Sequence, residues 1–140
     1  MANEKGELII IINTENDIVY QKEFNIETER EYISMYLLAY ASMDILDELV
    51  LLNNNMFYDT IGNQFGKKVS VFIMYCGFKI IYVNTARKSQ DVYKFLDFIS
   101  KKYNREMMEP FYDSDCMLKS SVFDRHVIEF YKRVNKMRSI

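Results

Sequence analysis

The sequence of 140 residues holds little of what small proteins use for catalysis or for covalent stabilisation. It contains one histidine, one proline, two cysteines, four glycines and no tryptophan. A single histidine excludes a His-x-x-x-His metal pair and a two-histidine acid–base system within one chain. Cys76 and Cys116 lie far apart and form no CxxC pair. They predict reduced thiols, with neither a zinc site nor a redox motif.

Long apolar runs are missing as well. The N-terminal residues MANEKGE lack the apolar stretch of a signal peptide. The longest apolar run near the start, Leu8–Ile12, is far shorter than the roughly 20 residues that cross a bilayer. We therefore expect a cytoplasmic protein whose contact with membranes is peripheral.

What the chain does have is apolar and aromatic content. Apolar residues make up 49% of it, with 11 Tyr and 10 Phe. A chain of this length and composition can bury one core without metal or disulfide support. No repeat, low-complexity segment or linker interrupts it, so we expect a single domain over residues 1–140.

Charge is distributed unevenly. Residues 1–60 hold 3 Lys or Arg and 12 Asp or Glu, whereas residues 61–140 hold 15 and 8. Opposite charges on different faces would orient the protein between unlike partners. Lys132, Arg133, Lys136 and Arg138 either complement the dipole of a last helix or attract an anionic membrane weakly. Nucleic acid is not an expected partner, because the chain is acidic overall and lacks aromatic platforms interleaved with basic residues.

β-Branched and apolar runs predict five strands: Leu8–Ile12, Ile18–Phe24, Met56–Ile61, Lys67–Cys76 and Phe78–Asn84. The first is apolar at every position, as in a central strand covered on both faces. The second alternates more and is expected at an edge.

Three amphipathic stretches predict helices. The first starts at a capping box formed by Thr28 and Glu31 and ends at Asn53. Ser89 is expected to cap the second, which runs from 90 to about 106, and Ser121 with Asp124 starts a third that runs to about 136. The expected buried stripes are Leu38, Ala41, Ile45, Leu49 and Leu52; Val92, Phe95, Leu96 and Ile99; and Phe123, Val127, Phe130 and Val134.

The predicted order is therefore ββαβββαα. It suits an α+β fold in which a five-stranded antiparallel sheet carries the first helix on one face and the last two helices on the other.

No sequence motif for phosphate binding or for nucleophilic catalysis is complete. Gly66-Lys67-Lys68 resembles the end of a phosphate-binding loop, but Ile61 stands where that motif requires glycine. His126 could pair only with Cys76 or Cys116, and no orienting or oxyanion motif accompanies it. Ser120 and Ser121 are explained as helix-capping oxygens. We expect no cofactor, metal or catalytic residue.

Asp44, Asp47 and Glu48 form an acidic ridge on the first helix, with no Lys or Arg within a helical turn. Two interpretations stay open. The ridge is either a solvated helix face or a site that recruits an Arg or Lys of a partner.

Two stretches carry a resemblance to a known family. One is YASMDILDELVLLNNNMFYD within residues 33–59, and the other is EPFYDSDCMLKSSVFDRHVIEFYKR, residues 109–133. Together they resemble the sedlin family of subunits of the trafficking protein particle (TRAPP) complex, a vesicle tether. The likeness covers nearly the whole chain. Asp44 matches an aspartate of the family pattern A-x-x-D-x-x-D-E, and the family signature SSxFDR is intact at Ser120, Ser121, Phe123, Asp124 and Arg125.

The resemblance implies a longin (SNARE-like) fold and a noncatalytic adaptor subunit acting between endoplasmic reticulum and Golgi. Its partners would be other TRAPP subunits, with an indirect link to a Rab GTPase. The SSxFDR signature would serve mainly structure, and Asp44 would be the best candidate for an interface. Contacts of loops 25–28 and 113–119 do not carry over, because those loops depart from the family. Alternatives are another longin subunit, such as a coat adaptor small chain, or a small enzyme. A SNARE regulatory domain is disfavoured, because no SNARE heptad helix or anchor follows.

Overall fold

The computed structural model describes residues 5–64 and 66–138, with side chains as far as Asn135. Its elements follow the predicted order ββαβββαα: β1 (Glu7–Ile12), β2 (Ile18–Phe24), α1 (Glu29–Leu52), β3 (Phe57–Gln64), β4 (Lys67–Ile73), β5 (Lys79–Asn84), α2 (Ser89–Met107) and α3 (Ser121–Arg138). The strands form one sheet in the order β2-β1-β5-β4-β3, and every neighbouring pair is antiparallel. The predicted α+β fold is confirmed.

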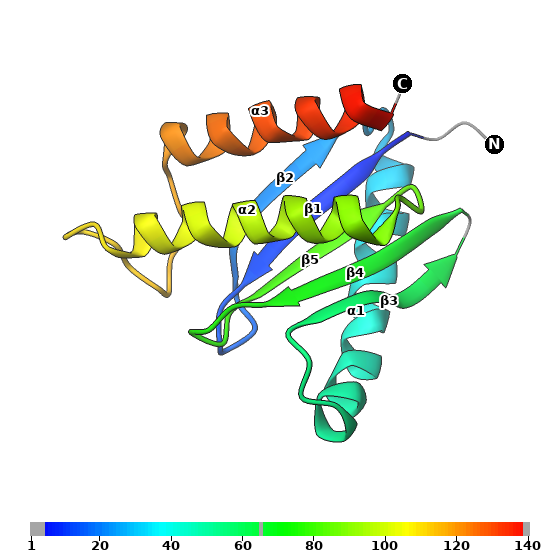
Figure 1. The fold of residues 1–140 in the computed structure, drawn as a ribbon, viewed down its shortest axis with the longest axis horizontal. Helices are drawn as coiled ribbons and strands as arrows, with labels where there is room; N and C mark the ends of the chain where they lie inside the picture. Colours follow the sequence, from blue (N-terminus) through cyan, green and yellow to red (C-terminus); the bar gives the residue numbers. More distant parts are fainter. Residues whose placement is uncertain (1–4, 65, 139–140) are drawn as a thin grey trace.

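Strand β1 is an inner strand of the sheet. It lies between β2 and β5, while β2 forms an edge of the sheet, as predicted (Figure 1). All six residues of β1 are buried. Ile9 and Ile11 belong to one core and Leu8 and Ile10 to the other, because successive side chains of a strand point to opposite faces.

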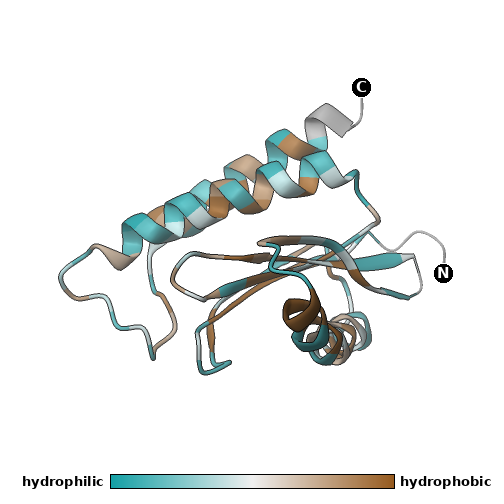
Figure 2. Cartoon of the chain, turned by 60° about the horizontal axis from the view of Figure 1, so that its bottom comes forward, coloured by the Kyte–Doolittle hydropathy of each residue, from teal (hydrophilic) through white to brown (hydrophobic). Residues whose placement is uncertain are grey.

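Two hydrophobic cores result, one on each face of the sheet. The first lies under α2 and α3, and the second lies under α1. Figure 2 shows α1 on one side of the sheet and the two other helices on the opposite side. This confirms the expected division of one helix against two.

The predicted buried stripe of α1 is wrong in part. Leu38 and Leu49 are half-buried, but Ala41, Ile45 and Leu52 are exposed. The residues that face the sheet are Glu31, Met35, Ala39, Ser42 and Leu46. Apolar residues occupy most of the circumference of α1, so more than one arc satisfies the spacing of three and four. The sheet packs against the side of α1 that includes Ser42. The Ser42 hydroxyl donates a hydrogen bond to the Leu38 carbonyl at 2.8 Å, which offsets the cost of burying that hydroxyl.

The residues that cap the helices differ in part from those predicted. The Thr28 hydroxyl accepts the Glu31 N–H at 3.1 Å, as expected, but the Glu31 carboxylate accepts the N–H of Glu27 rather than that of Thr28. Lys88, not Ser89, is the residue before α2, and its side chain makes no capping bond. For α3, Ser120 supplies the cap in place of Ser121, since its hydroxyl accepts the Phe123 N–H at 3.1 Å.

Strand ends differ from prediction at two turns. The β4 strand stops at Ile73, because the chain turns there and the Gly77 N–H donates to the Met74 carbonyl. Gly77 has φ +93, a left-handed conformation that glycine adopts without a steric penalty. At the other turn, β3 extends to Gln64, which pairs with Lys67.

Candidate functional site

The acidic ridge lies on the outward side of α1, where Asp44, Asp47 and Glu48 are all exposed. One basic residue reaches it, and that residue comes from the sheet rather than from the helix. Lys79 at the start of β5 places its Nζ 4.0 Å from Asp47 Oδ1. Asp44 and Glu48 make no side-chain hydrogen bond or ion pair to any other described residue. Two of the three carboxylates therefore remain available to a partner.

Exposed apolar side chains surround this ridge, and they were not identified as a surface from the sequence. Leu37, Asp44 and Leu51 are spaced by seven residues, or two helical turns, so they share one side of α1. Leu37 is 62% exposed and Leu51 is 87% exposed. The other large exposed apolar side chains of α1 are Ile33, Tyr40, Ile45, Val50 and Leu52. We call Ile33, Leu37, Tyr40, Asp44, Glu48 and Leu51 the outer face of α1.

Next to this face, a cavity of about 220 Å³ opens between α1 and the β1–β2 side of the sheet. It is lined by Ile10, Ile12, Asn16, Ile18, Tyr36, Ala39, Tyr40, Met43, Asp44, Asp47 and Ile81. Its floor is apolar and buried, and its rim carries the carboxylates of Asp44 and Asp47. α1 packs mainly against β3, which leaves this side of the sheet less covered.

Tyr36 and Tyr40 form a hydroxyl pair on the rim, 3.2 Å apart. The hydrogen bond to Tyr40, together with partial burial, raises the pKa of Tyr36 to about 12. Their rings also meet edge to face, with centroids 4.8 Å apart. The hydrogen bond and the ring contact join these two side chains on the rim beside the acidic ridge.

The family signature lies elsewhere and ties α3 to the sheet. Phe123 is buried in the core under α2 and α3. Asp124 accepts a hydrogen bond from the Tyr20 hydroxyl at 2.9 Å and lies 3.5 Å from Lys22 Nζ, both on β2. Burial and the bond to Asp124 raise the pKa of Tyr20 well above its ordinary value. Ser121 and Arg125 are exposed.

Further along α3, the predicted core residues Val127 and Val134 are buried, and Phe130 is half-buried. The Phe130 ring stacks on Phe98 of α2 at a centroid distance of 4.2 Å. Tyr131, which was not in the predicted stripe, is buried and stacks on Phe24 of β2 at 3.7 Å. Lys132 and Arg133 are exposed, while the side chains of Lys136 and Arg138 lie outside the described residues.

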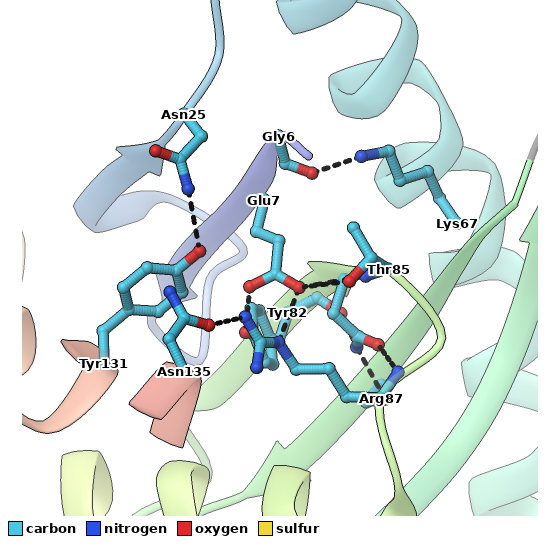
Figure 3. A network of polar contacts seen from close by, with 11 residues as sticks. Gly6, Glu7, Asn25, Lys67, Tyr82, Thr85, Arg87, Tyr131 and Asn135 are labelled. Atoms are coloured by element: carbon cyan, nitrogen blue, oxygen red, sulfur yellow. Dashed lines mark hydrogen bonds and ion pairs between the residues drawn. The ribbon is translucent and has the colours of Figure 1, made fainter. Parts of the chain in front are cut away.

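A buried polar network joins the ends of β1, β5 and α3 (Figure 3). The Glu7 carboxylate accepts hydrogen bonds from Arg87 Nε at 2.7 Å, from the Thr85 N–H at 3.0 Å and from the Tyr82 hydroxyl. Arg87 also donates to Asn135 Oδ1. Burial lowers the pKa of Arg87, but the hydrogen bond to Glu7 and the electrostatic interactions with Tyr82, Glu7 and Tyr131 together outweigh it, and the net shift is upward. Because Glu7 and Arg87 are both buried, the network serves packing and is closed to ligands.

The other residues tested for chemistry are scattered. Cys76 and Cys116 are free and exposed, and His126 is half-buried on α3. Lys68 on β4 pairs with the half-buried Asp59 on β3 at 2.6 Å. Among residues 5–64 and 66–138, no three His, Cys, Asp or Glu side chains gather as a metal site would require. The described helices also include none that is long and apolar enough to span a bilayer.

Comparison with known proteins gives consistent matches at low identity. The chain is 24% identical over 90 residues to the probable trafficking protein particle complex subunit 2 of Caenorhabditis elegans, covering 64% of each protein, which is less than two thirds. It is 21% identical over 129 residues to the transport protein particle 20 kDa subunit of Schizosaccharomyces pombe, covering 88% of this chain and 94% of that one. The probable trafficking protein particle complex subunit 2 of Drosophila melanogaster is 25% identical over 122 residues, covering 83% and 87%.

A family model described as Sedlin matches residues 11–133. That span contains the ridge on α1, strands β2 to β5 and the SSxFDR residues at the start of α3. Since the match covers far more than half of the chain, the chain belongs to the sedlin family.

Proposed function

We propose that this chain is a noncatalytic adaptor subunit of a TRAPP-type vesicle-tethering complex in transport from endoplasmic reticulum to Golgi. The names of three relatives support membership of such a particle. Its direct partners would be other subunits of the particle, and its link to a Rab GTPase would run through them. It would work in the cytoplasm, at the periphery of these membranes.

The observation that carries the proposal is the outer face of α1. Asp44 lies there among exposed Leu37, Tyr40 and Leu51 and has no partner among the described residues. Exposed apolar side chains that form a contiguous face usually mark a protein interface. An unpaired carboxylate within such a face gains a strong, charge-assisted hydrogen bond when a partner supplies Arg or Lys. A face of this kind suits assembly rather than catalysis.

Affinity purification of the tagged full chain, followed by identification of the proteins that co-purify, tests the proposal. We expect several subunits of a trafficking particle. Recovery of coat adaptins instead would mean that the chain is the small chain of a coat adaptor. Recovery of no partner would reject the adaptor role and direct attention to an enzyme.

A further inference from the structure

The cavity beside α1 has a floor suited to an apolar group. Ile10, Ile12 and Ile81 come from two neighbouring strands, and Ala39 and Met43 from the helix above them. At about 220 Å³ the space is well above what one water molecule requires. Aliphatic walls offer water few hydrogen bonds, so an apolar side chain gains from filling the cavity. A polar group would lose its hydration there without gaining a hydrogen bond from the cavity floor.

The rim of the same cavity is suited to a cation. Asp44 and Asp47 both lie on it, and the only described basic group in contact is Lys79, at 4.0 Å from Asp47. At that distance, and with the Asp47 side chain 70% exposed, the pair neutralises the rim only weakly. Asp44 is left without a counter-charge among the described residues.

We infer that this cavity receives an aliphatic side chain of a partner protein and that the same segment places an Arg or Lys against Asp44 and Asp47. The inference rests on the proposed function, because it gives the chemistry of the partner that the outer face of α1 binds. The apolar contact supplies most of the buried area. The charge pair then selects the segment, since an acidic neighbour would meet two carboxylates and be repelled.

Selection from a phage-displayed random peptide library on the immobilised full chain tests this chemistry. We expect the enriched peptides to share a Leu, Ile or Met close to an Arg or Lys. Synthetic copies should bind about tenfold or more weakly to the double variant D44N/D47N, which removes the charge and keeps the shape. They should bind comparably weakly to M43W, which fills the cavity from the helix side.

Two controls keep the result interpretable. I18W fills the cavity from β2 and replaces M43W should that variant melt early, and E129A on the opposite face should bind the peptides like the wild type. Peptides that bind M43W or I18W as well as the wild type would overturn the inference, as would an acidic consensus or no enrichment. A wild-type dimer that M43W and I18W dissociate would overturn it too, because the occupant would then be a second copy.

Co-purification with the same variants separates this inference from the proposed function. Trafficking-particle subunits that persist with M43W and I18W but not with D44A would leave the proposed function intact and reject the cavity as the docking point. A basic–aliphatic consensus without any such subunits in the wild-type purification would support the cavity and reject the particle.

Discussion

At the scale of single residues, the buried ion pair of Glu7 and Arg87 holds the fold together. Glu7 is buried and charged, yet its oxygens are saturated by hydrogen bonds from Tyr82, Thr85 and Arg87. The Arg87 guanidinium carbon lies 5.4 Å from the centroid of the Tyr131 ring on α3, so this contact also positions that helix. Asp44 is the contrast, because its carboxylate faces solvent without a partner among the described residues.

Glu7→Gln should destabilise the protein by about 3–5 kcal/mol, because it leaves the Arg87 charge buried without compensation. Urea unfolding followed by circular dichroism measures the loss. Glu129→Gln, the same change at an exposed site on α3, should alter stability by no more than about 0.5 kcal/mol. Equal effects of the two substitutions would mean that Glu7 is not part of a buried ion pair.

Two adjacent serines offer a second test. Ser120→Ala should cost about 1 kcal/mol, because its hydroxyl caps the first turn of α3 through the Phe123 N–H. Ser121→Ala should cost close to nothing, since Ser121 is exposed and already helical. Thermal melting of the two variants ranks them. A larger loss of stability for Ser121→Ala than for Ser120→Ala would mean that Ser121 is the cap.

At the scale of elements, the sequence predicts what depends on local pattern and misses what depends on the packing partner. The order of strands and helices, the central position of β1 and the inward residues of α2 follow from hydrophobic period. The buried side of α1 does not, because Ile45 and Leu46 are equally apolar and only the sheet decides which faces inward. The cap of α3 fails for a similar reason, since two neighbouring serines both fit the local motif.

The candidate site could likewise be predicted from the sequence only in part. The ridge of Asp44, Asp47 and Glu48 is readable in the sequence, and all three residues are exposed in the structure. The approach of Lys79 to Asp47 and the cavity beside α1 depend on tertiary contacts between the helix and β5, so no pattern along the chain could have given them.

Val127→Asp should destabilise the protein by roughly 3 kcal/mol or more, because Val127 is fully buried between α3 and the sheet core. Val122→Asp is the matched control on the same helix, with its side chain 48% exposed near the helix start, where a carboxylate is tolerated. Melting temperatures compare the two. An unchanged value for Val127→Asp would show that this side of α3 faces solvent.

At the scale of the whole molecule, the sheet separates two unlike surfaces. The face under α2 and α3 is closed by a large aromatic core, whereas the helix on the other face keeps apolar residues on its outside. Buried tyrosines are a consequence of the first core. Burial raises the pKa of Tyr82 and Tyr103 well above the ordinary value, helped by Glu7 at Tyr82 and, at Tyr103, by the hydrogen bond between the Tyr103 and Tyr112 hydroxyls.

These shifts predict the response to alkali. Between pH 10, where unfolded tyrosines ionise, and the higher folded pKa, the folded state binds more protons, so stability falls as pH rises above about 10 and is unaffected below it. Tyrosinate absorbance and circular dichroism recorded together should show Tyr82 and Tyr103 ionising only as the fold is lost. Ionisation of all 11 tyrosines near pH 10 in a folded chain would contradict this.

The central claim is that the outer face of α1 joins this chain to other subunits of a trafficking particle. The direct measurement is quantitative co-purification with wild type, Asp44→Ala and Glu129→Ala, paired with a thermal melt of each. Asp44→Ala should change stability by no more than about 0.5 kcal/mol yet reduce recovery of at least one subunit about tenfold or more, while Glu129→Ala keeps every partner. An Asp44→Ala chain that retains all its partners, or that loses them only because it melts early, would contradict the account.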